Sequence, residues 1–483
     1  MAAVVVVALA GGLLLRPGQN RATAVHLASA SSRPTETASA SPSPYVPKTD
    51  VTWNSAVGQG SRPDQVQVEQ DFVKRYNATN TDNIELWLQW SLPDCADCTF
   101  ANYLASSQAA DIFGPGGSSL LAFSPDFRLG LNDEIAKNKT DLGVYPPALL
   151  SALKNPAGQF EGLPYDESPA FIFYNKDLFA TAGLPDLPTK VGEKYLDHDW
   201  TWTELATVAK LLTLDSSGHN AIESSFNASK IQQYGFDDEC CHELRRLGTT
   251  FGAGSYLASD GKTAQLPPVW EETWKWYYDA LWTSHFAPTD TERTALESAA
   301  SSTAATGRVA MELAWSWGVD SFGASSGNGQ PVSKFQRWDM AVLPSNDGVT
   351  TVPVDSDMFV INEKTKVPDA AYKAMLAIMA DPAIRAVDGS LPLDPAQQAA
   401  YFKALQAGVD REFANSPINW SVLTEMDKYA ASPAFDAPTP NYGKVSADDY
   451  AFYDRLQTKS GLNLDTEIAK FKATLQADFN STG

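Results

Sequence analysis

The sequence predicts an α/β fold in which helices cover mainly parallel strands. Near the start of the folded region, short apolar strands alternate with amphipathic helices, and a second region of the same kind follows. Such alternation is typical of a parallel sheet with helices packed on its faces. The chain has 483 residues, a length that corresponds to roughly two to four domains or lobes.

Composition and charge exclude several classes of protein. With 43% hydrophobic and 19% charged residues, the chain is neither disordered, nor a small disulfide scaffold, nor a polytopic membrane protein. The 36 Lys and Arg residues against 58 Asp and Glu residues give a net charge of −22. Because such a surface repels phosphate backbones, we expect no nucleic-acid partner. We also expect a monomer with a neutral ligand and with no cofactor or metal centre.

Residues 1–49 are expected to form a signal or anchor segment followed by a linker. Residues 2–15 are an apolar run, shorter than the roughly 20 residues of a membrane span but suited to the core of a signal peptide. Residues 29–47 are rich in Ser, Thr, Ala and Pro, which favours a disordered tether. We therefore expect export to the cell surface or to the extracellular or periplasmic space. A membrane tether at the N-terminus remains open, and we expect no lipid anchor on a cysteine there.

The first folded region begins near Asp50. Its pattern predicts strands at 51–54, 84–90 and 111–113, and helices at 61–76 and 99–110. Ligands of parallel sheets bind beyond the carboxyl ends of the strands, where we expect Trp53, Trp90 and a loop at 114–117. This glycine-rich loop lacks the Lys-Ser/Thr of a P-loop, so nucleotide binding is not expected.

The second region shows further helix and strand signals. Thr201 and Glu204 have the spacing of a capping box, and 270–282 is an aromatic-rich helix whose rings we expect to pack in the core. Strands are predicted at 309–313, 338–343 and 358–362, and a helix at 368–379. The last helix is predicted to be capped by Asp465 and to bury Ile468, Phe471, Leu475 and Phe479.

Several short motifs occur in a recognisable order. These are Gly162-Leu163-Pro164-Tyr165-Asp166, residues 172–179, Ala182-Gly183-Leu184, residues 201–205, residues 307–311, Trp315-Ser316-Trp317, Val342-Leu343-Pro344, residues 359–362, residues 368–371 and residues 461–465. Their order along the chain resembles that of family-1 extracellular solute-binding proteins. That family includes maltose-binding protein and many sugar receptors of ATP-binding-cassette importers. The resemblance extends from about Asp50 to the end of the chain.

The resemblance implies a two-lobed, periplasmic-binding-protein-like fold with hinge crossovers and a ligand cleft between the lobes. By position, the crossovers fall near residues 166–171 and 355–360. Lobe one would then comprise residues 50–169 and 356–408. Lobe two would comprise residues 170–355 and 409–483.

Sugar recognition requires flat apolar rings and planar polar groups in a site that excludes water. The residues expected to bind the ligand are Trp53, Trp90, Tyr165, Asp166, Trp315, Trp317, Asp355 and Tyr442. Among them, Tyr165, Trp315 and Trp317 match the ligand segments of the resembled family by position. For each aromatic residue the alternative is packing in a core. For Asp355 and its neighbour Asp357, the alternatives are a calcium site and a solvated loop.

The four cysteines form two local pairs. Cys95 and Cys98 are spaced as in a redox motif, whereas Cys240 and Cys241 are adjacent. In an exported chain, disulfides are favoured over redox catalysis. We expect one bond within each pair; a zinc site from all four, or a disulfide between the pairs, is the alternative and would bridge the lobes.

Enzyme signatures are sparse. The five histidines are scattered without an HExxH motif, and residues 323–327 match G-x-S-x-G without a clear helix after them. Asp166 and Glu167 are neighbours on a predicted strand, so they point to opposite faces and cannot flank one glycosidic bond. We therefore expect no catalytic residues and no enzyme.

The resulting hypothesis is an exported receptor that captures a sugar by lobe closure and delivers it to the permease of an ATP-binding-cassette importer. The abundance of tryptophan, 13 residues in all, favours an oligosaccharide, since each sugar ring needs its own stacking surface. The alternatives are a secreted carbohydrate-active hydrolase or lyase and a sugar sensor without a transport role.

Overall fold

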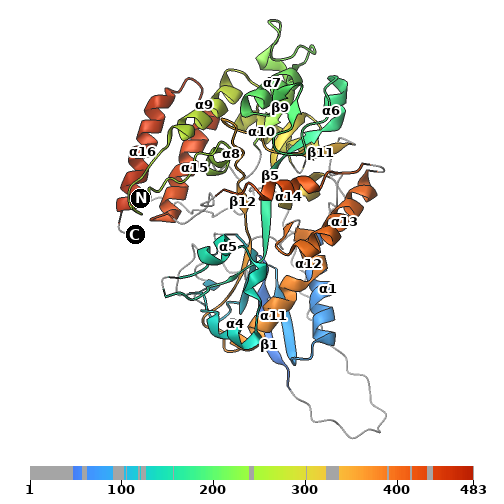
Figure 1. The fold of residues 1–483 in the computed structure, drawn as a ribbon, viewed down its shortest axis with the longest axis vertical. Coiled ribbons are helices and arrows are strands. Elements are labelled where there is room, and N and C mark those ends of the chain that lie inside the picture. The colour runs from blue at the N-terminus through green and yellow to red at the C-terminus, as the bar shows by residue number, and fades with distance from the viewer. Residues whose placement is uncertain are drawn as a thin grey trace.

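Two sheets, each with its own hydrophobic core, organise the chain into two α/β lobes joined by the long strand β5 (Asp166–Asn175) (Figure 1). The structure is a computed structural model, and it describes residues 47–56, 63–90, 103–104, 106–117, 120, 127–155, 157–238, 244–300, 302–322, 337–388, 391–413, 416–431 and 439–481. The predicted two-lobed α/β fold is confirmed.

Several predicted features lie outside these described residues. They are the apolar run at 2–15, nearly all of the linker, the G-x-S-x-G match at 323–327, residues 99–102 and 105 of the helix predicted at 99–110, and the cysteines Cys95, Cys98, Cys240 and Cys241. Among the helices that are described, none combines the length and the apolar composition required to cross a bilayer.

The sheet of the first lobe has the strand order β2-β1-β3-β13-β4. Its strands are β1 (Thr49–Asn54), β2 (Ile84–Gln89), β3 (Ile112–Gly116), β4 (Leu163–Pro164) and β13 (Met358–Ile361). β1 pairs in parallel with both β2 and β3, whereas β13 runs antiparallel to β3 and β4. The parallel order predicted for the first region is therefore confirmed, and the chain returns to this sheet with β13.

Helices pack around this first sheet. They are α1 (Pro63–Thr79), α4 (Asn132–Asn138), α5 (Pro147–Ala152), α11 (Pro368–Ala380) and α12 (Pro382–Asp388), with the 3₁₀ turn η2 (Leu142–Val144). In the core, Val51 and Ile112 of the strands meet Phe72 of α1 and Met375 of α11. Burial alternates at the start of β2, because Ile84 and Leu86 are buried and Trp87 is exposed.

The sheet of the second lobe has the order β11-β5-β10-β9-β8. Besides β5 it contains β8 (Leu214–Asp215), β9 (Ile231–Asp237), β10 (Val309–Trp315) and β11 (Trp338–Ala341). Two short strands, β12 (Val354–Asp355) and β14 (Leu391–Pro392), pair with the first half of β5. The first half of β5 therefore forms part of the junction between the lobes, and its second half forms part of the second sheet.

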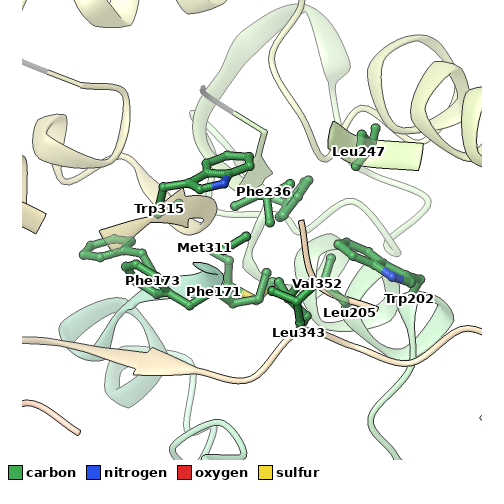
Figure 2. Close-up of a cluster of buried hydrophobic side chains, with 14 of the residues drawn as sticks. Phe171, Phe173, Trp202, Leu205, Phe236, Leu247, Met311, Trp315, Leu343 and Val352 are labelled. Carbon is green, nitrogen blue, oxygen red and sulfur yellow. The ribbon is translucent and has the colours of Figure 1, made fainter. Parts of the chain in front are cut away.

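Helices and 3₁₀ turns surround the second sheet on both sides (Figure 1). They are α6 (Lys176–Thr181), α7 (Trp202–Leu212), η3 (Ala228–Lys230), α8 (Leu244–Thr250), α9 (Pro268–Trp282), α10 (Asp290–Glu297), η4 (Ala304–Thr306), η5 (Ser316–Phe322), α13 (Pro395–Glu412), α14 (Ser421–Asp427), α15 (Tyr442–Thr458) and α16 (Leu464–Asn480). A small hairpin joins β6 (Lys194–Tyr195) to β7 (His198–Asp199). Figure 2 shows Phe171 and Met311 of the strands beside Leu205 of α7 in this core.

The aromatic-rich helix α9 packs in the core, as predicted. Trp270, Trp274 and Tyr277 are almost wholly buried. The ring of Trp274 meets the rings of Phe452 and Phe471 edge-on, with centroids 4.9 and 5.6 Å apart. Edge-to-face pairs of this kind add to the free energy of burial, so α9 holds α15 and α16 against the second sheet.

Two predicted helix starts have different outcomes. The side chain of Thr201 accepts a hydrogen bond from the backbone N–H of Glu204, which confirms the start of α7. The prediction that Asp465 caps α16 is wrong, because Asn463 is the cap and accepts from the N–H of Thr466. Asn and Asp cap helices about equally well, and Asp465 pairs instead with Lys275 of α9. The predicted buried stripe from Ile468 to Phe479 is confirmed.

The second change of lobe occurs earlier than residue 408. Helix α12 packs against α1 of the first lobe. From Leu391 onward the apolar residues belong to the second core, among them Tyr401, Leu405 and Val409 of α13. The predicted boundary therefore falls inside α13, whose apolar face is buried against the second lobe.

A buried ionic cluster lies inside the second lobe. The Arg293 guanidinium donates to both Asp237 and Asp238, at 3.1 Å from Nε to Asp237 Oδ1 and 2.9 Å from Nη2 to Asp238 Oδ1. Thr303 donates to Asp237, and Tyr453 donates to Asp238. Burial raises the pKa of Asp238, and the charge of Arg293 opposes this rise. The cluster joins β9 to α10 and α15.

We expect Arg293→Ala to lower the free energy of unfolding by about 3–5 kcal/mol, because it leaves the two aspartates buried without their cation. The matched control is Arg75→Ala, which removes an exposed ion pair to Asp381 and should cost about 0–1 kcal/mol. Urea unfolding measures both. Equal losses in the two variants would contradict the structural role of the cluster.

Candidate functional site

The junction between the lobes is built by strand pairing. In the first half of β5, Asp166 and Glu167 pair with Pro392 and Leu391 of β14. The next residues, Ser168 and Pro169, pair with Asp355 and Val354 of β12. Both pairings are antiparallel, so carboxylate-bearing residues that are far apart in the sequence meet where the chain crosses between the lobes.

Asp166 fixes the turn that follows β12. It is 1% exposed, and its Oδ1 accepts a hydrogen bond of 3.0 Å from the N–H of Asp357. The hydroxyl of Ser356 donates to the backbone carbonyl of Asp166, at 2.8 Å. The N–H of Tyr165 donates to the carbonyl of Asp357, also at 2.8 Å. The carboxylate of Asp166 thus positions residues 356–357.

The carboxyl end of β3 reaches this junction from the first lobe. A Cβ atom added to Gly117 would lie 3.6 Å from Oδ1 of Asp357 and 3.7 Å from Oδ1 of Asp355. The glycine-rich segment differs from the predicted loop, because 114–116 belong to the buried strand β3. Pairing of Gly116 with Met358 of β13 explains why this segment is extended.

Arg246 of α8 connects the junction to the aromatic residues of the second lobe. Its Nη2 lies 2.9 Å from Oδ2 of Asp355, and its Cζ lies 5.2 Å from the centroid of the Trp315 ring. A guanidinium against an indole face is a stabilising cation–π contact. The side chain therefore covers part of Trp315 and compensates the charge of Asp355.

Trp315 and Trp317 form an aromatic pair where β10 ends. Their ring centroids are 6.4 Å apart and their planes differ by 18°. Trp315 is 2% exposed, whereas Trp317 is half-buried. Nε1 of Trp315 and Oγ of Ser316 are buried and have no hydrogen-bond partner among the described residues. Both are donors that a polar ligand group can satisfy.

Tyr442 lies near the same region because it contacts Arg245, the residue before Arg246 in α8. It is the first residue of α15, and Cζ of Arg245 lies 5.1 Å from its ring centroid. Arg245 also donates to Ser446 of α15, at 3.0 Å. Because Arg245 and Arg246 are consecutive in α8, Tyr442 and Trp315 are linked to one short helix.

The remaining candidate residues lie elsewhere. Trp53 is wholly buried in the first core, and its Nε1 donates to the carbonyl of Gly114. Tyr165 is 1% exposed, and its ring lies between Phe359 and Arg385. Trp90 follows β2, the outer strand of the first sheet, and is exposed. Neither Trp53 nor Tyr165 presents a free ring face in this arrangement of the lobes.

The structure thus brings together Asp166, Asp355, Trp315, Trp317 and Tyr442. Sequence reasoning missed the two arginines that join them. Consecutive arginines in so acidic a chain were the available signal, but their partners are distant in the sequence. Within the described residues, no group of three or more His, Cys, Asp or Glu side chains is placed to hold a metal ion.

The family described as bacterial extracellular solute-binding protein matches residues 109–405 of the chain. This match spans more than half of the 483 residues. The chain therefore belongs to that family.

Solved structures with the same fold cover nearly the whole chain. An ABC substrate-binding protein from Listeria monocytogenes in complex with cycloalternan is 18% identical, with a TM-score of 0.65 over 90% of this chain and 100% of that one. The cyclic alpha-maltosyl-1,6-maltose binding protein from Arthrobacter globiformis is 18% identical, with a TM-score of 0.61 over 89% and 99%. UgpB from Mycobacterium tuberculosis in complex with glycerophosphocholine is 15% identical, with a TM-score of 0.64 over 90% and 99%. A comparison with curated proteins found no match. These likenesses support the fold.

Gly114 lies in β3 and Gly117 lies just after its end. We expect alanine to lower the stability at the first position but not at the second. Gly114 has φ +140°, and an added Cβ would lie 2.7 Å from the carbonyl oxygen of Met358. Gly114→Ala should therefore lower the free energy of unfolding by about 1–3 kcal/mol. Gly117→Ala makes only ordinary contacts and should keep wild-type stability. Thermal unfolding of both variants checks this, and a stable Gly114→Ala would show that β3 and β13 are not in contact there.

Proposed function

We propose that the chain is an exported receptor that captures a sugar, and specifically an oligosaccharide, by closure of its two lobes. In this proposal it delivers the sugar to the permease of an ATP-binding-cassette importer and does not transform it. The ligand binds at the junction, where the end of β3, the crossover strands and the Trp315–Trp317 pair come together.

The observation that carries this proposal is the connected set Asp355, Arg246, Trp315 and Trp317. It combines a carboxylate and a guanidinium, which hydrogen-bond to hydroxyl groups, with flat rings that stack on sugar C–H faces. The charges of Asp355 and Arg246 compensate each other, which favours a neutral ligand. One solved structure of this fold is described as a complex with cycloalternan and another as a cyclic alpha-maltosyl-1,6-maltose binding protein, and this supports the substrate class.

Closure follows from differential affinity. A ligand that contacts both lobes binds the closed arrangement more tightly, so it shifts the population toward that arrangement. Gly117 belongs to the first lobe and Trp315 to the second, and both approach Asp355 or its partner Arg246. A sugar placed between them would touch both lobes. The family description and the apolar run at 2–15 support export.

Within the site, we assign the stacking surface to Trp317 and a supporting role to Trp315. Trp315 is covered by Arg246 and by the neighbouring indole, whereas Trp317 retains exposed surface. The proposal therefore retains Asp166, Asp355, Trp315, Trp317 and Tyr442 at or beside the ligand. It assigns Trp53 and Tyr165 to the first core.

A thermal-shift screen of the purified chain against mono- and oligosaccharides tests the ligand class. A sugar at 100 times its dissociation constant should stabilise the protein by about 2.7 kcal/mol. We expect an oligosaccharide hit that product analysis recovers unchanged. Cleavage of the hit would favour the carbohydrate-active enzyme, and no response to any sugar would refute the proposed ligand class.

For a sugar found in this way, Trp317→Ala should weaken binding by about 1–3 kcal/mol, because it removes a ring that stacks on the ligand. The control is Trp87→Ala, which truncates an exposed tryptophan on the outer strand β2 of the first lobe and should bind as the wild type does. Isothermal titration measures both. Unchanged affinity in Trp317→Ala would remove this residue from the site.

A further inference from the structure

Helix α8 carries two consecutive arginines that contact different parts of the molecule. Arg246 lies 2.9 Å from Asp355 of β12 and 5.2 Å from the centroid of the Trp315 ring. Arg245 is 3% exposed and faces α15, where its Nε lies 3.8 Å from Oδ2 of Asp449. Each guanidinium therefore pairs with a carboxylate on a different element.

Tyr256 holds Asp449 in place. The carboxylate is 1% exposed, and its Oδ1 accepts a hydrogen bond of 2.7 Å from the hydroxyl of Tyr256. The ring of Tyr256 packs on the ring of Trp270 in α9, with centroids 4.5 Å apart. One oxygen of the carboxylate is thus bound by Tyr256, while the other faces Arg245.

The same tryptophan also contacts α8 directly. A Cβ atom added to Gly248 would lie 2.0 Å from Cζ3 of Trp270, so the indole ring lies against the backbone of the helix. Nε1 of Trp202 donates to the carbonyl of Thr250 at 3.1 Å. The C-terminal half of α8 is therefore fixed by packing and by this hydrogen bond, whereas the first half, which carries the two arginines, is tied to α15.

The charge of Asp449 matters because Arg245 is buried beside a second arginine. A buried guanidinium that loses its counter-charge is strongly destabilised. Without the carboxylate of Asp449, Arg245 would move toward solvent or toward Asp355, and either movement displaces the first half of α8. The guanidinium of Arg246 would then leave the ring of Trp315.

We propose that Asp449 is a positioning residue for the ligand site. From its buried place in α15 it holds Arg245, which fixes the first half of α8 and so keeps Arg246 against Asp355 and Trp315. Asp449 acts through these arginines and does not itself contact the sugar. The effect on sugar affinity rests on the proposed function, whereas the effect on α8 and Trp315 does not.

Fluorine NMR of the ligand-free full chain, labelled with fluorotryptophan, tests the position of Arg246. The resonance of Trp315 is assigned from its loss in Trp315→Phe, and Arg246→Gln gives the shift that results when the cation leaves the ring. We expect Asp449→Asn to move this resonance in the same direction. The matched control is Asp454→Asn, which alters an exposed aspartate of the same helix and should leave the resonance unmoved.

An unmoved Trp315 resonance in Asp449→Asn, or an equal displacement in Asp454→Asn, overturns the proposal. Tyr256→Phe provides a second variant in case Asp449→Asn fails to fold. It removes the hydroxyl that donates to Asp449 and keeps the ring that packs on Trp270. It should move the resonance in the same direction by a smaller amount, and an unmoved resonance in this variant would count equally against the proposal.

Binding supplies the second arm. For a sugar identified by the screen, Asp449→Asn should weaken binding by about threefold to thirtyfold, and Asp454→Asn should bind as the wild type does. In an Arg246→Gln background the same substitution should cause no further loss, because the guanidinium that Asp449 positions is gone.

Unchanged affinity in Asp449→Asn, or a loss of equal size in both backgrounds, would overturn the link between Asp449 and the site. Isothermal titration measures these affinities. If no sugar binds at all, the proposed function fails, while the fluorine spectra still decide whether Asp449 positions α8.

Discussion

The architecture depends on one constraint: a single strand must leave one hydrophobic core and enter another without exposing unpaired backbone groups to an apolar environment. Strand β5 meets this constraint along its whole length. β12 and β14 pair with its first half, and β10 and β11 pair with its second half. The crossover therefore brings together segments that are distant in the sequence, and the residues beside them become neighbours.

These pairings concentrate carboxylates where the lobes meet, and each carboxylate has a different environment. Asp166 accepts from a backbone N–H. Asp355 is neutralised by the guanidinium of Arg246. Burial, as the largest cause, raises the pKa of Glu167 to about 8.

The aromatic residues show the limit of motif-based assignment. Trp315 ends β10, whereas Tyr165 lies between β4 and β5 and Trp317 lies in η5. Which ring faces a ligand depends on what covers it. Phe359 and Arg385 cover Tyr165, and Arg246 covers Trp315, whereas Trp317 remains partly exposed.

The sequence alone determined the alternation of strands and helices, the start of α7 at Thr201 and the buried stripe of α16. These features depend on residues within one or two turns of each other, so their period and capping chemistry are visible in the sequence. Tertiary structure decided the rest. Asn463 rather than Asp465 caps α16, and α13 joins the second core. Arg246 meets Asp355 across a separation of 109 residues. Such outcomes depend on which distant surfaces are buried together, and local periodicity carries no record of that choice.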